Sequence, residues 1–421
     1  MSRHGRKHAA AHFLTAALYM TAALALVPAV AHSRADAAAA RRQRGPRLVP
    51  NRVELRGRPA FSLNLPEGYG VSVAAEGMRR VRFMALSPDG RVFVTDMHSL
   101  ADNRRGAVYV LEGFDPGRKT FARRKTYLSS LRNPNSVAFH TDARGETWLY
   151  LALTDRLVRF RYRAGDDAPS GEPQTLATFP DYGLDYKYGG WHLTRTVVVS
   201  AEGRVYVSVG SSCNACEEKE EVRASIVEMD ADGRNQRHVA RGLRNAVGLK
   251  LVGGRLYATN MSADHLGDHR PADTMYAVEG GRNYGWPYCY QSGPRVLPDP
   301  KFNPRGAKFD CRRVPAAFAA FDAHGSPLGL EFFGGGFGPE LDGQFLVALH
   351  GPVGKRINPG HRVVRVRGGE GDASSPAETF IDGFRSGARV HGRPCDIMRF
   401  GPRAFLVTDD HAGAVYYVYK K

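Results

Sequence analysis

The sequence predicts an all-β protein folded as a six-bladed β-propeller. Six segments share one form, in which a Gly or polar turn precedes a strand of alternating aromatic and β-branched residues. A second strand usually follows each of them, and strand pairs that recur every several tens of residues are typical of a propeller or solenoid. Few stretches show the 3.6-residue period of a helix. Six such pairs therefore indicate six blades.

The six pairs follow one another along the chain. Their first strands lie in residues 87–96, 143–155, 200–210, 252–260, 341–351 and 401–410. Their second strands read GAVYVLE, RLVRFRY, ASIVEMD, DTMYAVE, HRVVRVR and GAVYYVY. A pair of packed sheets is the alternative all-β fold, but it does not explain the repeated turn-and-strand form. In a propeller, loops at one end of the central channel converge, so functional groups are expected at equivalent places in different blades.

Residues 1–31 are expected to be a secretory signal peptide. The basic segment RHGRK precedes a mostly apolar run over residues 13–31, and the Ala-Val-Ala sequence at 29–31 is a small-x-small cleavage site. Cleavage after Ala37 is an alternative. The run is also nearly long enough for a single membrane anchor, but its Ala-rich composition and Pro28 favour a cleaved signal.

The rest of the chain divides into two parts. Residues 32–60, rich in Ala, Arg and Pro, are expected to form a linker or an N-terminal strap, and residues 61–421 the propeller domain. The expected location is periplasmic or secreted, with no stable membrane insertion after cleavage.

The formal net charge of +17 comes largely from Arg residues that are dispersed through turns and strands. A nucleic-acid-binding protein would gather such charge in a patch, so no nucleic-acid partner is expected. A solvated basic surface is the simpler interpretation, and it still favours anionic ligands or membrane surfaces.

Five cysteines occur in this chain, and export permits disulfides. Cys289 and Cys311 flank one loop and are expected to form a structural bridge. Cys213 and Cys216 are spaced CxxC, which leaves a tight local bridge and a free pair as alternatives. Cys395 is then the remaining thiol. A zinc site would need a second ligand pair, and none has the spacing for it.

Polar residues recur where strand pairs of different blades begin. His192 stands at a loop-to-strand boundary, and imidazole is the side chain best suited to take a proton near neutral pH. Arg244 and Asn245 offer a fork of N–H donors beside an amide, which suits carboxylates or quinone oxygens and stabilises a forming oxyanion. Asn135 and Arg393 hold the same position before the second and sixth pairs. Taken singly, each of these is more often a packed, turn or surface residue.

The end of the fifth first strand adds His350, in the sequence ALHG. The loop NMSADHLGDHRPAD carries Asp264, Asp268 and Asp273 together with free carbonyls, which are the oxygen ligands that calcium prefers. A solvated acidic loop is the equal alternative on spacing alone. The sequence contains no GxGxxG between a strand and a helix, no P-loop, no GxSxG and no HExxH.

Taken in order, these motifs resemble the pyrroloquinoline quinone (PQQ)-dependent sugar dehydrogenases of the soluble glucose dehydrogenase and sorbosone dehydrogenase type. The resemblance covers most of the chain after the proposed signal, from LPEGYGVSV to the final DDHAGAVYYVY. Its specific pieces are WHLTR, YVSVGSSCNACEE, GLRNAVGL, HLGD with GRNYGWPY, HGSPLGL, ALHG, and HGRPCDI followed by VTDD.

The resemblance implies a six-bladed propeller with PQQ over the channel. By this resemblance His192 matches the base that takes the proton of a substrate hydroxyl while hydride passes to the quinone. Arg244 and Asn245 match residues that contact PQQ oxygens, and Arg393 matches a cofactor-contacting Arg. The list of implied cofactor-binding residues is completed by Asn135 and His350, and a Ca²⁺ ion is implied at the backbone carbonyls of Ser262 and Ala263.

Three positions depart from soluble glucose dehydrogenase. Cys395 stands where a second Arg is expected, Ser211 replaces the acidic residue that orients the base, and the neighbourhood of His350 replaces a Lys. These departures make the chain look closer to the sorbosone-type branch.

The leading hypothesis is a PQQ-dependent dehydrogenase that oxidises a sugar hydroxyl or a hydrated aldehyde. It would pass electrons to a quinone or cytochrome acceptor. A calcium-dependent lactonase on a non-PQQ propeller is one alternative, but it would need acidic channel residues where this chain has Arg and His. A catalytically silent propeller acting as a binding module is the other, because of Ser211 and Cys395.

Overall fold

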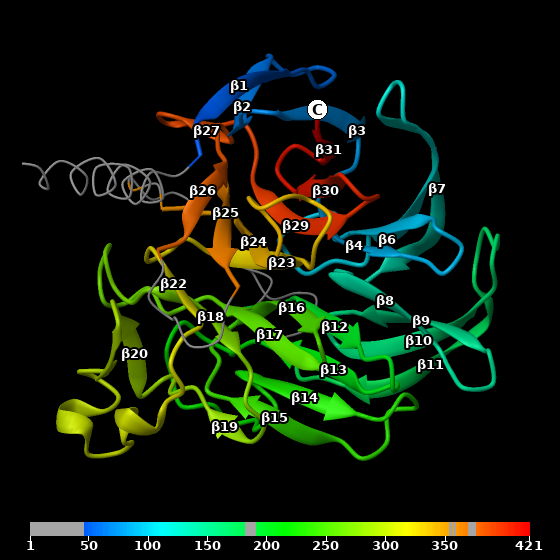
Figure 1. Cartoon of the computed structure of the whole chain (residues 1–421). Coiled ribbons are helices and arrows are strands. Elements are labelled where there is room, and N and C mark those ends of the chain that lie inside the picture. Colours follow the sequence, from blue (N-terminus) through cyan, green and yellow to red (C-terminus); the bar gives the residue numbers. More distant parts are fainter. Residues whose placement is uncertain (1–45, 182–190, 353–356, 358, 369–375) are drawn as a thin grey trace, which may run out of the picture. The chain divides into compact units, whose positions relative to one another are not determined.

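The computed structural model describes residues 46–181, 191–352, 357, 359–368 and 376–421 (Figure 1). The expected signal peptide and the first part of the expected linker, residues 32–45, lie outside the described residues. Residues Pro46–Lys421 form one unit. No helix in the described part of the chain is long and apolar enough to span a membrane.

The described residues form six sheets of four or five antiparallel strands, apart from one short parallel strand. In chain order, blade 1 contains β4 (Val81–Leu86), β5 (Val92–Asp96), β6 (Gly106–Asp115) and β7 (Thr120–Leu131); blade 2 contains β8 (Ser136–Thr141), β9 (Thr147–Ala152), β10 (Arg156–Tyr162) and β11 (Ser170–Thr178); blade 3 contains β12 (Arg195–Val199), β13 (Val205–Val209), β14 (Ser225–Met229), β15 (Arg237–Arg241) and the parallel β19 (Arg282–Asn283). Blade 4 contains β16 (Ala246–Val252), β17 (Arg255–Asn260), β18 (Asp273–Ala277) and β22 (Ala319–Phe321); blade 5 contains β23 (Pro327–Phe333), β24 (Gln344–Leu349), β25 (Arg362–Arg367) and β26 (Glu378–Ile381); blade 6 contains β29 (Pro394–Arg399), β30 (Ala404–Asp409), β31 (Ala414–Lys420) and β3 (Tyr69–Ala75).

The remaining elements lie outside the blades. They are β1 (Leu48–Val53) with β2 (Phe61–Pro66), β20 (Cys289–Ser292) with β21 (Arg295–Pro298), β27 (Arg385–Ser386) with β28 (Arg389–Val390), and the 3₁₀ turns η1 (Pro304–Gly306) and η2 (Cys311–Arg313). The region expected as a linker or strap thus contains β1, which pairs with β2 in antiparallel register.

The predicted strand pairs are the second and third strands of the six blades, so the all-β, six-bladed prediction is confirmed. The backbone conformation explains why a Gly recurs in the turn before each of these strand pairs. In blades 1 to 3 the turn Gly has a positive φ, and its N–H donates to the carbonyl three residues earlier, as Gly90 does to Ser87 at 2.9 Å. Gly adopts that conformation without steric cost.

The apolar core is divided among the junctions between neighbouring blades. Six hydrophobic clusters each combine residues of two adjacent sheets, such as Trp148 and Tyr150 of blade 2 with Val207 and Val227 of blade 3. Strands buried on both faces read as nearly continuous apolar runs, whereas outer strands such as β7 and β11 are largely polar. Each blade is therefore stabilised mainly by its two neighbours.

A central channel runs along the first strands of the blades. Residues from β4, β8, β12, β16, β23 and β29 line a cavity of about 470 Å³. Phe83, Val247, Leu328 and Cys395 form an apolar cluster near the starts of four of these strands. Cys395 is the free thiol and is completely buried, so this position has a packing role here.

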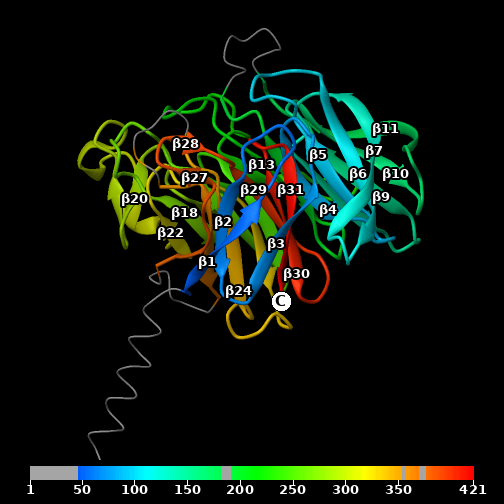
Figure 2. The same cartoon turned by 90° about the horizontal axis from the view of Figure 1, so that it is seen from above.

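The ring is closed by strands from opposite ends of the chain. β3 forms the outer edge of blade 6 by antiparallel pairing with β31, from Tyr69 opposite Lys420 to Ala75 opposite Val415. Figures 1 and 2 show the blue β3 beside the red β31. Blade 6 therefore combines one strand from the start of the described chain with three strands from its end.

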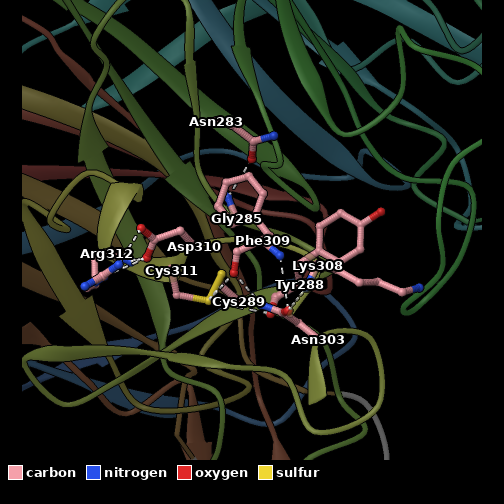
Figure 3. The surroundings of a disulfide bond; sticks show 10 residues. All are labelled: Asn283, Gly285, Tyr288, Cys289, Asn303, Lys308, Phe309, Asp310, Cys311 and Arg312. Carbon is pink, nitrogen blue, oxygen red and sulfur yellow. Dashed lines mark hydrogen bonds and ion pairs between the residues drawn. A yellow bond between two sulfur atoms is a disulfide. The ribbon is translucent and has the colours of Figure 1, made fainter. Parts of the chain in front are cut away.

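Both disulfides lie in loops outside the blade strands. Cys289–Cys311 ties β20 to η2 within the long connection from β18 to β22, with Asn303 beside the sulfur of Cys311 (Figure 3). This bridge was predicted and is confirmed. Cys213–Cys216 is also a disulfide, which decides between the two alternatives left open by the CxxC spacing.

A buried polar network connects four blades at one end of the channel. The Arg82 guanidinium donates to the Asn135 Oδ1 atom at 3.0 Å and to Asp410 Oδ2 at 2.9 Å. The other Asp410 oxygen lies 2.8 Å from His350 Nε2. Burial alone would raise the pKa of Asp410, but His350 and Arg82 outweigh it and lower the pKa. These contacts join blades 5, 6, 1 and 2.

Replacing Asp410 by Asn should lower the free energy of unfolding by about 3 kcal/mol, because Arg82 would remain as an uncompensated buried charge. Denaturant unfolding followed by circular dichroism measures this change. Asp167→Asn is the matched control, because it removes a carboxylate from an exposed pair with Lys125 and should leave the unfolding midpoint unchanged. Equal stability of Asp410→Asn and the unmodified protein would contradict the expectation.

Candidate functional site

The structure places all the candidate site residues at one end of the ring. In each blade the start of the first strand lies opposite the end of the second, as Arg195 pairs with Val209 and Pro394 with Asp409. Residues before first strands and residues after second strands therefore share that end. The former are Asn135, His192, Arg244, Asn245 and Arg393, and the latter are Ser262, Ala263 and His350.

His192 is held by the loop that follows β13. Its Nδ1 atom lies 2.9 Å from the Ser211 carbonyl oxygen and 3.0 Å from the Ser211 hydroxyl. A proton on Nδ1 satisfies the carbonyl and leaves Nε2 as the acceptor, and none of the described residues bonds to Nε2. Ser211 thus orients the imidazole without a charge. The resemblance to soluble glucose dehydrogenase implied an acidic residue at this position.

Gly210 allows His192 and Asn245 to approach each other. A Cβ atom at this glycine would lie 2.5 Å from the Cβ of His192 and 2.5 Å from the Asn245 Oδ1 atom. Any side chain would force these residues apart, so the glycine of YVSVG brings blades 3 and 4 together at the site.

His192 is neutral at neutral pH. Burial lowers its pKa well below 6.5, and the positive charge of Arg244 lowers it further, while the hydrogen bond to Ser211 only partly opposes them. Protonation in the resting site is disfavoured, so the imidazole is free to accept a proton.

Arg244 is a buried guanidinium held by neutral oxygens. Its Nε atom donates to the Asn214 carbonyl at 2.8 Å, and its two terminal nitrogens donate to Asn214 Oδ1 at 3.0 Å and to the Met261 carbonyl at 3.3 Å. The nearest carboxylate, that of Asp264, lies 3.6 Å away and is half exposed. Burial lowers the pKa of Arg244, with Asp264 opposing the effect.

Arg393 has a similar environment in blade 6. Its guanidinium donates to the carbonyl oxygens of His350, at 3.2 Å, and of Gly351, and it forms no ion pair with the described residues. Burial lowers its pKa to about 10, with the Asp410 carboxylate opposing. Two buried cations from different blades therefore lie at the same end of the channel, and the one ion pair that the described residues offer them is that of Arg244 with the half-exposed Asp264.

Asn135 and His350 are engaged by the protein itself. Asn135 is completely buried. Its Oδ1 atom accepts a hydrogen bond from Arg82, and its Nδ2 atom donates to Thr196 Oγ1 at 2.9 Å. His350 is bonded to Asp410, and burial lowers its pKa to about 4. In this structure both side chains connect blades.

The loop after β17 presents backbone oxygens. The N–H of Ser262 donates to Asp273 Oδ1 at 2.7 Å and its hydroxyl to the Ala272 carbonyl at 2.7 Å. None of the described residues donates to the carbonyls of Ser262 or Ala263. Asp273 is buried, which raises its pKa to about 7 despite backbone bonds from Ser262 and Ser326.

Side chains alone do not form a cation site at this end. The only cluster of three His, Cys, Asp or Glu among the described residues is Cys213, Cys216 and Glu218. Both sulfurs of that cluster are in a disulfide. A hard cation would therefore require carbonyl oxygens such as those of Ser262 and Ala263.

Several contributors to the site had no assigned role in the sequence interpretation. Asn214 contacts Arg244, and His324 Nδ1 lies 2.7 Å from Asp264 Oδ1. Arg82 contacts Asn135, and Asp410 contacts His350. The motifs CNAC, HGSPLGL and VTDD contain three of these residues, but only their positions in space reveal the partners.

Comparisons with known proteins agree with this architecture. The chain matches the PQQ domain of a pyranose dehydrogenase from Coprinopsis cinerea with a TM-score of 0.71, at 18% identity over 87% of this chain and 100% of that one. It matches a calcium structure of the family AA12 enzyme of Trichoderma reesei with a TM-score of 0.71, at 16% identity over 88% and 100%.

A third match is the PQQ-bound aldose sugar dehydrogenase of Streptomyces coelicolor, with a TM-score of 0.58, 17% identity, and coverage of 84% of this chain and 99% of that one. At these identities the likeness shows the fold. No curated protein matches the sequence.

The family model described as TrAA12-like matches residues 63–384, most of the chain. This match confirms the resemblance to PQQ-dependent sugar dehydrogenases that the ordered motifs indicated. The chain belongs to the TrAA12-like family, a family of PQQ-dependent oxidoreductases.

Proposed function

We propose that this protein oxidises a sugar hydroxyl or a hydrated aldehyde with bound PQQ, using His192 as the general base. The observation that carries the proposal is that a neutral, partly exposed His192 and the buried Arg244 lie at one end of the propeller, near enough for Arg244 to lower the pKa of His192. The proposal also takes support from membership in the TrAA12-like family and from PQQ-containing structures among the similar proteins.

The residues at this end fit an anionic quinone. Arg244 and Arg393 are buried guanidinium groups whose hydrogen bonds go to carbonyl or amide oxygens. Arg393 forms no ion pair with the described residues, and the ion pair of Arg244 is with the half-exposed Asp264 at 3.6 Å, so neither charge is fully balanced by a buried carboxylate. Burying an unpaired charge is costly, and an anionic ligand removes that cost. Asn245 adds an amide beside Arg244, and its nitrogen has only a weak partner, the Met261 sulfur at 3.2 Å.

The chain's own groups divide the chemistry among them. PQQ, when bound, supplies the carbonyls that accept the electrons of the substrate. His192 Nε2 accepts the proton of the substrate hydroxyl, and the Ser211 carbonyl keeps Nδ1–H in place during that transfer. Arg244 and Asn245 hold the anionic oxygens through N–H donors and stabilise negative charge that develops there.

Calcium is proposed at the loop after β17. The carbonyl oxygens of Ser262 and Ala263 would bind it, because none of the described residues uses them and Asp273 fixes the loop through the N–H of Ser262. A calcium structure is among the similar solved structures.

The finer assignments remain part of this proposal. A sorbosone-type substrate preference would follow from the departures at Ser211 and Cys395. Two disulfides fit an oxidising compartment, in agreement with a signal peptide over residues 1–31 and a periplasmic or secreted enzyme. A quinone or a cytochrome would receive the electrons.

Reconstitution tests the proposal directly. The apoprotein is incubated with PQQ and Ca²⁺, and dye reduction is followed over a panel of sugars and aldehydes. We expect PQQ binding and turnover of at least one aldose, both reduced when a chelator removes Ca²⁺. Absence of PQQ binding would overturn the proposal, and binding without turnover of any sugar or aldehyde would identify a silent propeller instead.

His192→Ala should retain PQQ but lower kcat by about 100-fold or more, because positioned general bases contribute at least that factor. Cofactor titration and dye reduction at saturating sugar measure the two quantities separately. His140→Ala is the control, because His140 lies on β8 at the other end of the channel and should leave kcat unchanged. A His192→Ala protein with full turnover would exclude His192 as the base.

The pH dependence of kcat/KM should reflect the lowered pKa of His192. Burial and Arg244 disfavour the imidazolium, so the base stays deprotonated as the pH falls through 6.5, the value for an unperturbed imidazole. We expect kcat/KM to be constant from pH 8 to 6.5 and to fall only below 6.5. Circular dichroism over the same range controls for unfolding, and an acid limb at or above 6.5 would contradict the assignment.

A further inference from the structure

The disulfide loop Cys213–Cys216 lies against both groups assigned to the chemistry. It follows β13 directly and carries Asn214 and Ala215 between its two cysteines. Its residues are partly exposed. The proposed function uses His192 and Arg244 but assigns no part to this loop.

Two oxygens of Asn214 accept hydrogen bonds from one edge of the Arg244 guanidinium. The carbonyl oxygen of Asn214 accepts from Nε at 2.8 Å, and its Oδ1 atom accepts from a terminal nitrogen at 3.0 Å. Bidentate binding of this edge is usually the work of a carboxylate. Here both oxygens are neutral, so they orient the guanidinium without adding to the partial charge balance from the half-exposed Asp264 at 3.6 Å.

The same Oδ1 atom also accepts the N–H of Asp264 at 2.9 Å. Asn214 thus joins the loop after β13 to the loop after β17, which carries the proposed calcium carbonyls. Removing the side chain would release the terminal nitrogen of Arg244 and the Asp264 backbone together.

The loop holds His192 through Ser211. The Ser211 hydroxyl donates to the Cys213 carbonyl at 2.7 Å and lies 3.0 Å from His192 Nδ1. The N–H of Ser211 donates to the Arg244 carbonyl at 2.8 Å. The position of Cys213 is therefore coupled to the base as well as to the cation.

The disulfide adds a covalent constraint to a loop that is also held by hydrogen bonds. The N–H of Ser212 donates to Glu218 Oε1 at 2.6 Å, and the Ser212 hydroxyl lies 3.7 Å from Cys216 Sγ. Only two residues separate the cysteines. Closing so short a ring removes most of the backbone freedom of Asn214. Reduction would restore that freedom at the residue on which Arg244 depends.

We propose that Asn214, fixed by the Cys213–Cys216 disulfide, is the positioning residue that orients Arg244 for an anionic cofactor, and that reduction of this disulfide weakens cofactor binding. The inference rests on the proposed function, since PQQ is the anion expected there. Asn214 acts through Arg244 and does not itself take part in the reaction.

Two substitutions separate geometry from charge. Asn214→Ala removes Oδ1 and should weaken PQQ binding about tenfold, the effect of one lost bond to a charged group. Asn214→Asp keeps an acceptor but cancels the charge of Arg244, so it should also weaken binding. Only Asn214→Asp should move the acid limb of kcat/KM to higher pH, because a nearby carboxylate raises the pKa of His192.

Gln174→Glu is the matched control for these variants. Gln174 Oε1 accepts from Arg159 Nε at 2.9 Å on the exposed β11, so this substitution makes the same amide-to-carboxylate change beside an Arg far from the site. PQQ titration by absorbance in the presence of Ca²⁺ should give the unmodified dissociation constant for Gln174→Glu. Unmodified affinity in both Asn214 variants would overturn the inference.

The disulfide is tested with Cys213→Ser/Cys216→Ser, a double substitution that leaves Cys289–Cys311 intact. We expect the double variant to bind PQQ as weakly as Asn214→Ala does. A phosphine reductant should weaken PQQ binding by the unmodified protein and leave PQQ binding by the double variant unchanged. A folded double variant with full affinity would overturn the role of the disulfide.

One further readout does not depend on PQQ. The terminal ¹⁵Nη2–¹H signal of Arg244, assigned by its absence in Arg244→Lys, should exchange faster with solvent in Asn214→Ala than in the unmodified protein, because this nitrogen donates to Asn214 Oδ1. If the unmodified protein bound no PQQ, the proposed function would fail while this signal still tested the positioning. Unchanged exchange in Asn214→Ala would refute the role of Asn214 in either case.

Discussion

Closure of the ring by β3 and β31 is the constraint on which the rest of the structure depends. A blade of this protein buries its apolar faces only against its two neighbours, because the six hydrophobic clusters lie between blades. The candidate site depends on the same closure, since its residues come from blades 2 to 6. Pairing Tyr69 with Lys420 holds blade 6, and with it Arg393, next to blade 1.

Electrostatics at the site follow from burial combined with neutral partners. Arg244 and Arg393 are held by carbonyl oxygens, which fix their orientation. The carboxylate nearest to Arg244 is the half-exposed Asp264 at 3.6 Å, and Arg393 forms no ion pair with the described residues. The contrast within the same end is Arg82, whose charge is matched by Asp410 at 2.9 Å. Ion pairing thus connects the blades around the channel, while the cations assigned to the cofactor remain open to an anion.

His192 owes its neutral state to the same arrangement. Its own burial and then its neighbour Arg244 disfavour the imidazolium, and Ser211 orients the ring through oxygens that carry no charge. An acidic residue at position 211 would raise the pKa of the base instead. The serine at this position is therefore consistent with a proposed base that stays deprotonated at lower pH.

Local patterns in the sequence determined the strand pairs, their turns and the ends at which polar residues collect. Alternation along a strand and a Gly with positive φ depend on neighbours a few residues apart, so the pairs from 87–96 to 401–410 could be located without coordinates. The same patterns placed His192 and Arg244 at strand starts. They also made Cys289–Cys311 the expected bridge, because both cysteines flank one loop.

The tertiary structure alone decided which side chains meet. Arg82 and Asp410 are 328 residues apart, and Asn214 reaches Arg244 across 30 residues, so no local period reports either contact. It also assigned β3 to the last blade and directed Asn135 and His350 into contacts between blades. These outcomes depend on how the ring closes and on which side chains it buries together, and a sequence pattern of period two contains neither.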